Sequence, residues 1–147
     1  MRGNSTLTPI LIAALLYFAI VFSVGFLLGP IRVLLLEPAV GSTVAVLCEA
    51  PLLLTAMILA ARWLPKKLQL PMTATALATM GIGALILQQL ADLAVGLYVR
   101  ELTSTQMLET YKTPVGAIYA LLLAAFAAMP AVVNMVTRKW DSKTSAY

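Results

Sequence analysis

The stretch of sequence that decides the fold is Leu70–Val99, LPMTATALATMGIGALILQQLADLAVGLYV. Its one charged side chain is Asp92, and it exceeds the roughly 20 apolar residues that a helix needs to cross the hydrocarbon core of a bilayer. A carboxylate inside such a helix is costly unless it is paired or hydrated. The stretch therefore predicts a membrane helix that needs polar partners.

Three further apolar stretches are long enough for the same role, and we expect membrane helices at 9–36, 43–64 and 114–136 beside the one at 70–99. The composition agrees, because 61% of the 147 residues are hydrophobic and only 11% are charged. The mean hydropathy is +0.95. The sequence predicts an all-α fold, a polytopic membrane protein whose single domain, 1–147, is an antiparallel bundle of four transmembrane helices with a polar tail at 138–147.

The first span has a competing interpretation as a secretory signal peptide, because Arg2 precedes the apolar run. A signal peptide has a shorter apolar core, of roughly 7–15 residues, that ends at a small-x-small cleavage site. The nearest such site, Ser23-Val24-Gly25, lies inside the run with no polar stretch after it. We therefore expect a membrane helix with Thr8 as its N-cap and Pro9 in its first turn.

Basic residues near the helix ends predict the orientation, because cytoplasmic loops carry an excess of Lys and Arg. If the amino terminus is cytoplasmic, that side holds Arg2, Arg62, Lys66, Lys67, Arg138, Lys139 and Lys143, and the outer side holds Arg32, Arg100 and Lys112. This distribution favours both termini in the cytoplasm. We expect a multi-pass protein of the cell membrane, the inner membrane of a bacterium.

Two connections lie on the expected outer side. The first, Glu37–Ser42, is a short turn that makes the first two helices antiparallel neighbours. The second, 100–113, has two interpretations. Ser104 could cap a short interfacial helix that places Met107, Leu108 and Tyr111 together, or the segment could be a solvated polar loop.

The candidate site consists of the polar residues within the expected spans, which are Arg32, Glu49, Gln88, Gln89 and Asp92. At about 1.5 Å per residue, Glu49 and Asp92 both lie roughly 10 Å from the outer ends of their helices. Gln88 and Gln89 precede Asp92 by one turn on nearly the same face. We expect one intramembrane polar cluster in the outer half of the bundle. Because it holds one cation and two carboxylates, one carboxyl is expected to be protonated unless Arg100 or water compensates its charge.

Small residues at helical spacing predict where helices pack closely. Gly25 and Gly29 form a GxxxG sequence on the helix that carries Arg32, so that Arg32 faces a partner helix. On the fourth helix the small residues Gly116, Ala120, Ala124 and Ala128 form a stripe without charge. We expect this helix to serve packing.

Several classes of function have no support in the residues present. The chain has no histidine and a single cysteine, Cys48, so we expect no metal site, no cofactor and no internal disulfide. The basic residues lie at helix ends without interleaved aromatic residues, so we expect no nucleic-acid partner. No catalytic constellation or phosphate-binding glycine loop is present, and we expect that the protein is not an enzyme.

In length and helix number the chain resembles the small multidrug exporters, whose four-helix subunits dimerise and exchange protons for cationic drugs at a membrane-embedded glutamate on the first helix. Here the first helix carries Arg32, and the candidate glutamate, Glu49, is on the second.

Two functions from different classes remain. The first is a packing or accessory module in a homo-oligomer or larger membrane complex, with Arg32, Glu49 and Asp92 as its internal polar lock. The second is an oligomeric transporter, of a small solute or coupled to protons, that uses Glu49 and Asp92.

Overall fold

A computed structural model describes the backbone of residues 4–144 and the side chains of residues 7–140. Every regular element in that part of the chain is a helix, so the all-α prediction is confirmed. The elements are α1 (Asn4–Ile31), the π-helical segment η1 (Arg32–Leu36), α2 (Glu37–Val40), α3 (Ser42–Lys67), α4 (Ala74–Ala94), the π-helical segment η2 (Val95–Val99), α5 (Ser104–Thr110) and α6 (Pro114–Thr144). Four continuous helical stretches are long and apolar enough to cross a membrane: Leu7–Val40, Ser42–Lys67, Ala74–Val99 and Pro114–Trp140.

The ends of all four long helices differ from the predicted boundaries. α1 begins at Asn4, so Thr8 is not its N-cap and Pro9 lies inside the helix. α4 begins only at Ala74, where the Thr73 side chain accepts a hydrogen bond from the Ala76 N–H at 3.2 Å. α3 and α6 both continue beyond the predicted ends, and the predicted polar tail is helical as far as Thr144. The amino-terminal residue used for orientation, Arg2, lies outside the described residues.

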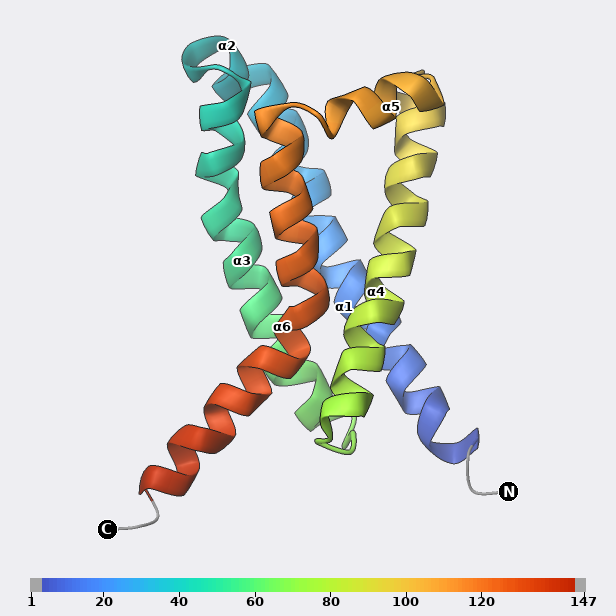
Figure 1. Cartoon of the computed structure of the whole chain (residues 1–147), viewed down its shortest axis with the longest axis vertical. Coiled ribbons are helices and arrows are strands. Elements are labelled where there is room, and N and C mark those ends of the chain that lie inside the picture. The colour runs from blue at the N-terminus through green and yellow to red at the C-terminus, as the bar shows by residue number, and fades with distance from the viewer. Residues whose placement is uncertain (1–3, 145–147) are drawn as a thin grey trace.

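The four long helices alternate in direction along the chain, and the first turn of α1 and the last turn of α6 lie opposite α2 and α5 (Figure 1). The predicted antiparallel arrangement holds for the packed pairs α1–α3 and α4–α6, whereas α1 and α4, and α3 and α6, pack in parallel. α1 packs against α3 and α4, and α6 packs against the same two helices. The prediction that the first two long helices are neighbours is confirmed. Gly41 makes the turn between them at φ 81°, a conformation that favours glycine because it lacks a Cβ.

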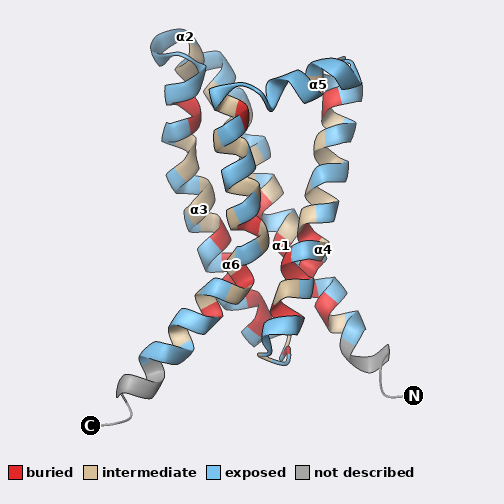
Figure 2. Ribbon diagram, viewed as in Figure 1, coloured by how far each residue is buried: buried red, intermediate tan, exposed pale blue. Residues whose placement is uncertain are grey.

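Buried residues concentrate in the half of the bundle that lies away from α2 and α5 (Figure 2). The core there includes Tyr17, Leu64, Met80 and Phe126. The ring of Tyr17 stacks on that of Phe126 with centroids 4.6 Å apart, and its hydroxyl donates to the Phe126 carbonyl at 3.0 Å. This contact joins α1 to α6 across the bundle. The half next to α2 and α5 contains few buried residues, so polar contacts between its helices replace most of the apolar packing there.

The closest helix approach lies at a glycine other than the predicted pair. A Cβ added to Gly81 would lie 1.9 Å from the Ala127 carbonyl oxygen, so α4 and α6 meet backbone to backbone there. A Cβ at Gly29 would have no atom within 4 Å, and one at Gly25 would make an ordinary 3.6 Å contact with Leu53. The GxxxG sequence of α1 therefore does not mark a close crossing within this chain.

The small-residue stripe of α6 also lies differently from the prediction. Gly116 is buried, but Ala120, Ala124 and Ala128 are exposed. The inward face of α6 is occupied instead by the buried residues Phe126, Pro130 and Asn134, which follow one another at i, i+4. The rotation of α6 is thus set by its bulky side chains, and the alanine stripe faces out of the bundle.

Candidate functional site

Arg32 holds together the end of the bundle that contains α2. Its Nη1 donates to Glu37 Oε1 at 3.0 Å, and its Nε lies 3.0 Å from Glu49 Oε2 on α3. The three side chains keep only 22%, 29% and 11% of their surface exposed, in the order Arg32, Glu37 and Glu49. Ion pairs that are this well shielded from water are stronger than those on a surface, and they are more costly to break. We call these three residues the arginine group.

The local backbone explains why Arg32 and Glu37 meet. Arg32 opens the π-helical segment, and the Glu37 N–H bonds to the Arg32 carbonyl, five residues earlier. In an α-helix residues five apart point in different directions, whereas this wider turn brings them nearly above one another. Sequence reasoning placed Glu37 in the outer turn and missed this contact. The signal that could have found it was an acid within one wide turn of the arginine.

The electrostatics of the arginine group are unbalanced. One guanidinium faces two carboxylates, so the group carries a net negative charge if all three side chains are ionised. The buried Arg32 Nε makes no hydrogen bond, because its N–H is not aimed at the Glu49 oxygen that lies 3.0 Å away. The contact with Glu49 is therefore an ion pair without a directed hydrogen bond.

Asp92 forms a second group with different partners. Gln88 Nε2 donates to Asp92 Oδ1 at 2.9 Å, and the Tyr119 hydroxyl on α6 donates to Asp92 Oδ2. The ring of Tyr111, which follows α5, lies against Tyr119 with centroids 6.1 Å apart. We call Asp92, Gln88 and Tyr119 the aspartate group. It joins α4 to α6 at the end of the bundle where α5 lies.

Sequence reasoning missed Tyr119 because it lies on another helix, distant in sequence from Asp92. A signal was present, since Tyr119 is the only polar side chain in the apolar run between Pro114 and Val133. Tyrosine can satisfy a buried carboxylate without supplying a charge. Among the side chains that the structure describes, none of the cations forms an ion pair with Asp92.

The predicted single cluster is therefore two groups. The structure pairs Arg32 with Glu49 and Gln88 with Asp92, and the described side chains show no hydrogen bond or ion pair between these pairs. Gln89, which was expected to join the cluster from nearly the same face, makes no hydrogen bond to Asp92 among the described residues. Gln89 is exposed, because each residue turns the helix by about 100° and Gln88 takes the inward position.

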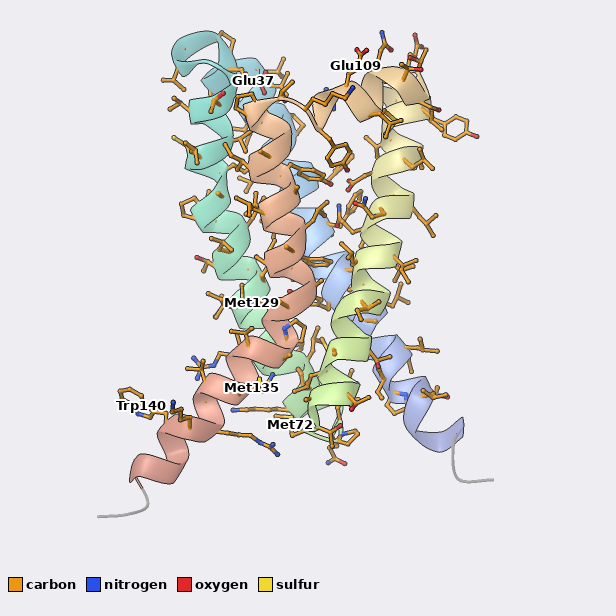
Figure 3. The ribbon with its side chains drawn as sticks, in the orientation of Figure 1. Glu37, Met72, Glu109, Met129, Met135 and Trp140 are labelled. Atoms are coloured by element: carbon orange, nitrogen blue, oxygen red, sulfur yellow. The ribbon has the colours of Figure 1, made fainter. Side chains whose placement is uncertain are left out.

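The segment after Arg100 is folded rather than irregular. α5 is capped by Thr103, not by the predicted Ser104, and Gln106 completes a capping box. The Met107 side chain packs close to Gly96 of η2, but Leu108 is exposed over 67% of its surface. The short helix that was one of the two predictions for this segment is therefore present, and the placement of Met107, Leu108 and Tyr111 along a membrane interface stays a prediction. Glu37, the first residue of α2, and Glu109 on α5 mark the same end of the bundle (Figure 3).

The opposite end has its own polar contacts. Asn134 is buried and donates from Nδ2 to the Ala61 carbonyl at 3.1 Å and to the Pro130 carbonyl at 2.7 Å, which ties α6 to α3. A shallow pocket of about 220 Å³ lies near this end and is lined by Arg62, Val136, Thr137 and Trp140. It touches neither the arginine group nor the aspartate group.

No protein-family model, no curated protein and no solved structure matches this chain. Any inference about function therefore depends on the residues and geometry described above.

Proposed function

We propose that this chain is a small multi-pass protein of the cell membrane, which in a bacterium is the inner membrane. We further propose that it acts as a packing and assembly module. It would function as a homo-oligomer or beside a larger membrane complex, with the lipid bilayer as its surroundings. The length and apolarity of its four long helices support the membrane location.

The distribution of basic and aromatic residues supports an orientation with both termini in the cytoplasm. The end of the bundle that holds the termini carries Arg62, Lys66, Lys67, Arg138 and Lys139. Two exposed tryptophans, Trp63 and Trp140, lie at the same end, and the Lys67 Nζ is 4.5 Å from the Trp63 ring centroid. An aromatic and basic boundary of this kind is typical of the cytoplasmic interface of a membrane helix.

The observation that carries the proposed role is the way the arginine group uses its charges. Arg32 forms ion pairs with Glu37 and Glu49 of the same chain, so these charges connect η1, which continues α1, to α2 and α3. Charges used in this way specify which helices meet. The pocket described above lies at the other end of the molecule, away from this group.

Native mass spectrometry of the protein, extracted mildly from its own membrane, tests this role. We expect a defined homo-oligomer or a stoichiometric complex with another polypeptide. A protein that is strictly monomeric at every detergent concentration would contradict the proposal. The extraction should precede any overexpression, because excess copies separate a module from its partners.

The aspartate group favours a second function, transport of protons or of a small cationic solute. Among the described residues, only the neutral groups Gln88 and Tyr119 donate hydrogen bonds to Asp92, so its charge is left to be balanced by a proton or a bound cation. An acid of this kind inside a membrane helix is a common element of proton pathways.

Flux measurements decide between the two functions at Asp92. In vesicles with a pH gradient, transport predicts that Asp92→Asn lowers proton flux about tenfold or more, to the level of empty vesicles, while the protein stays folded. Glu109→Gln is the matched control, because Glu109 is an exposed acid at the same end of the bundle. If wild-type vesicles leak no faster than empty ones across solutes and pH values, the transport function is wrong.

A further inference from the structure

α4 exposes an amide on its outward face. Gln89 is exposed, and within the described part of the chain its side chain makes no hydrogen bond. Exposed hydroxyls on the long helices behave differently. Ser23, Thr55 and Thr79 each donate to the carbonyl four residues earlier, at 2.7, 2.7 and 2.8 Å. These hydroxyls are satisfied by their own helix, whereas Gln89 has both a donor and an acceptor left for a partner.

The depth of Gln89 makes this exposure costly. It lies roughly 15 Å from the Val99 end of the stretch Ala74–Val99, at about 1.5 Å per residue. The hydrocarbon core of a bilayer is about 30 Å thick, so Gln89 would lie near its middle. A glutamine side chain is too short to reach the interface from there, unlike lysine or arginine. An amide facing lipid at this depth would lose its hydrogen bonds to water without replacement.

The neighbours of Gln89 share a helix-pairing pattern. Thr79, Ile82, Ile86, Gln89 and Leu93 follow one another at alternating steps of three and four residues, and all five are exposed. This is the spacing of the contact line between two helices that wind around each other. A single polar residue within such an apolar line fixes the register of the pair. We call these five residues the α4 seam.

We propose that the α4 seam packs against the α4 seam of a second copy of this chain, with the two Gln89 amides hydrogen-bonded to each other. This inference rests on the proposed function, since it requires that the chain spans a membrane and assembles. All copies insert in the same orientation, so a two-fold axis along the membrane normal brings identical helices together in parallel. Each residue near the axis then meets its own counterpart. An amide is complementary to itself, which is why a second copy fits this position.

Cysteine cross-linking in native membranes tests the contact. Cys48 is exposed and is first replaced by alanine so that it cannot cross-link. In this background, single cysteines at Ile82, Ile86, Gln89 and Leu93 should each give a disulfide-linked homodimer on mild oxidation. Ala94→Cys and Leu121→Cys are the controls, because both positions are exposed but lie off the seam. They should cross-link at least fivefold less.

A second measurement separates the contribution of the Gln89 amide to dimerisation from that of the apolar packing between the two helices. Energy transfer between labelled copies in vesicles should show that Gln89→Leu weakens dimerisation between about threefold and about twentyfold, the range for hydrogen bonds between membrane helices. The double variant Gln89→Leu/Leu121→Gln has the same composition as the wild type but moves the amide off the seam, to an exposed position of α6. It should dimerise as weakly as the single variant.

Three results would overturn the proposal that the α4 seam forms the dimer contact, and they have different consequences for the proposed function. Cross-links at Leu121 or Ala94 in place of Gln89 would mean that another face forms the oligomer, and the assembly role would stand. Cross-links from Gln89 to a different polypeptide would make α4 the contact of a mixed complex, again leaving the assembly role. No cross-link at any position, together with a monomer in native mass spectrometry, would overturn both.

Discussion

Replacing Arg32 by methionine is expected to lower the free energy of unfolding by about 3 kcal/mol or more, because breaking a buried ion pair leaves uncompensated charge behind. Glu37 and Glu49 would then face each other without their cation, in a place where Glu49 keeps only 11% of its side-chain surface exposed. Glu49→Gln should cost less, since Arg32 keeps its 3.0 Å contact with Glu37. Equilibrium unfolding in mixed micelles, followed by circular dichroism, measures both.

A triple variant provides the control for this prediction. Arg32→Met combined with Glu37→Gln and Glu49→Gln removes all three charges together, and it should recover most of the lost stability. Replacing a whole buried ionic group by uncharged side chains is often close to neutral, because the desolvation cost of the charges disappears as well. If Arg32→Met alone unfolds like the wild type, the arginine group does not hold the helices. Wild-type stability of Arg32→Met, together with a loss of proton flux in Glu49→Gln, would favour the transport function.

Replacing Gly81 by alanine should destabilise the bundle by about 1–3 kcal/mol, the cost of overpacking, and valine should cost more. The added Cβ would lie 1.9 Å from the Ala127 carbonyl oxygen, and this neighbour is backbone, which cannot move without shifting α6. The same crossing positions Asp92 against Tyr119, because both contacts join α4 to α6. Gly81→Val should therefore also weaken the aspartate group. Unfolding in mixed micelles measures the first effect.

Gly29→Ala is the matched control, because it is the same substitution inside a helix of the same chain. A Cβ at Gly29 would meet no atom within 4 Å, and alanine is the better helix former by about 1 kcal/mol. Gly29→Ala should be neutral or stabilising. Equal losses for Gly81→Ala and Gly29→Ala would show that the α4–α6 crossing is looser than described here.

The number and approximate location of the long helices could be predicted from the sequence, but their ends, and the partners of the polar residues, could be predicted only in part. The similar depth of Glu49 and Asp92 predicted one shared cluster and left open which carboxylate would meet Arg32, whereas the i, i+4 spacing placed Gln88 beside Asp92. Tyr119 was not predicted because a tyrosine in an apolar run has no periodic signal that points to a distant acid. Glu37 was not predicted because an ordinary helical turn would have directed it away from Arg32.

The sequence alone determined that the described chain is helical, that four stretches are apolar enough to cross a membrane, and which polar residues lie inside them. These properties depend on each stretch by itself, because a helix satisfies its own backbone hydrogen bonds and apolarity is a sum over its residues. The tertiary structure decided the rotation of each helix about its axis. That rotation divides the polar residues into the arginine group and the aspartate group, turns Gln89 outward and places the closest crossing at Gly81. It arises from the packing of bulky and small side chains between helices, which no single helix contains.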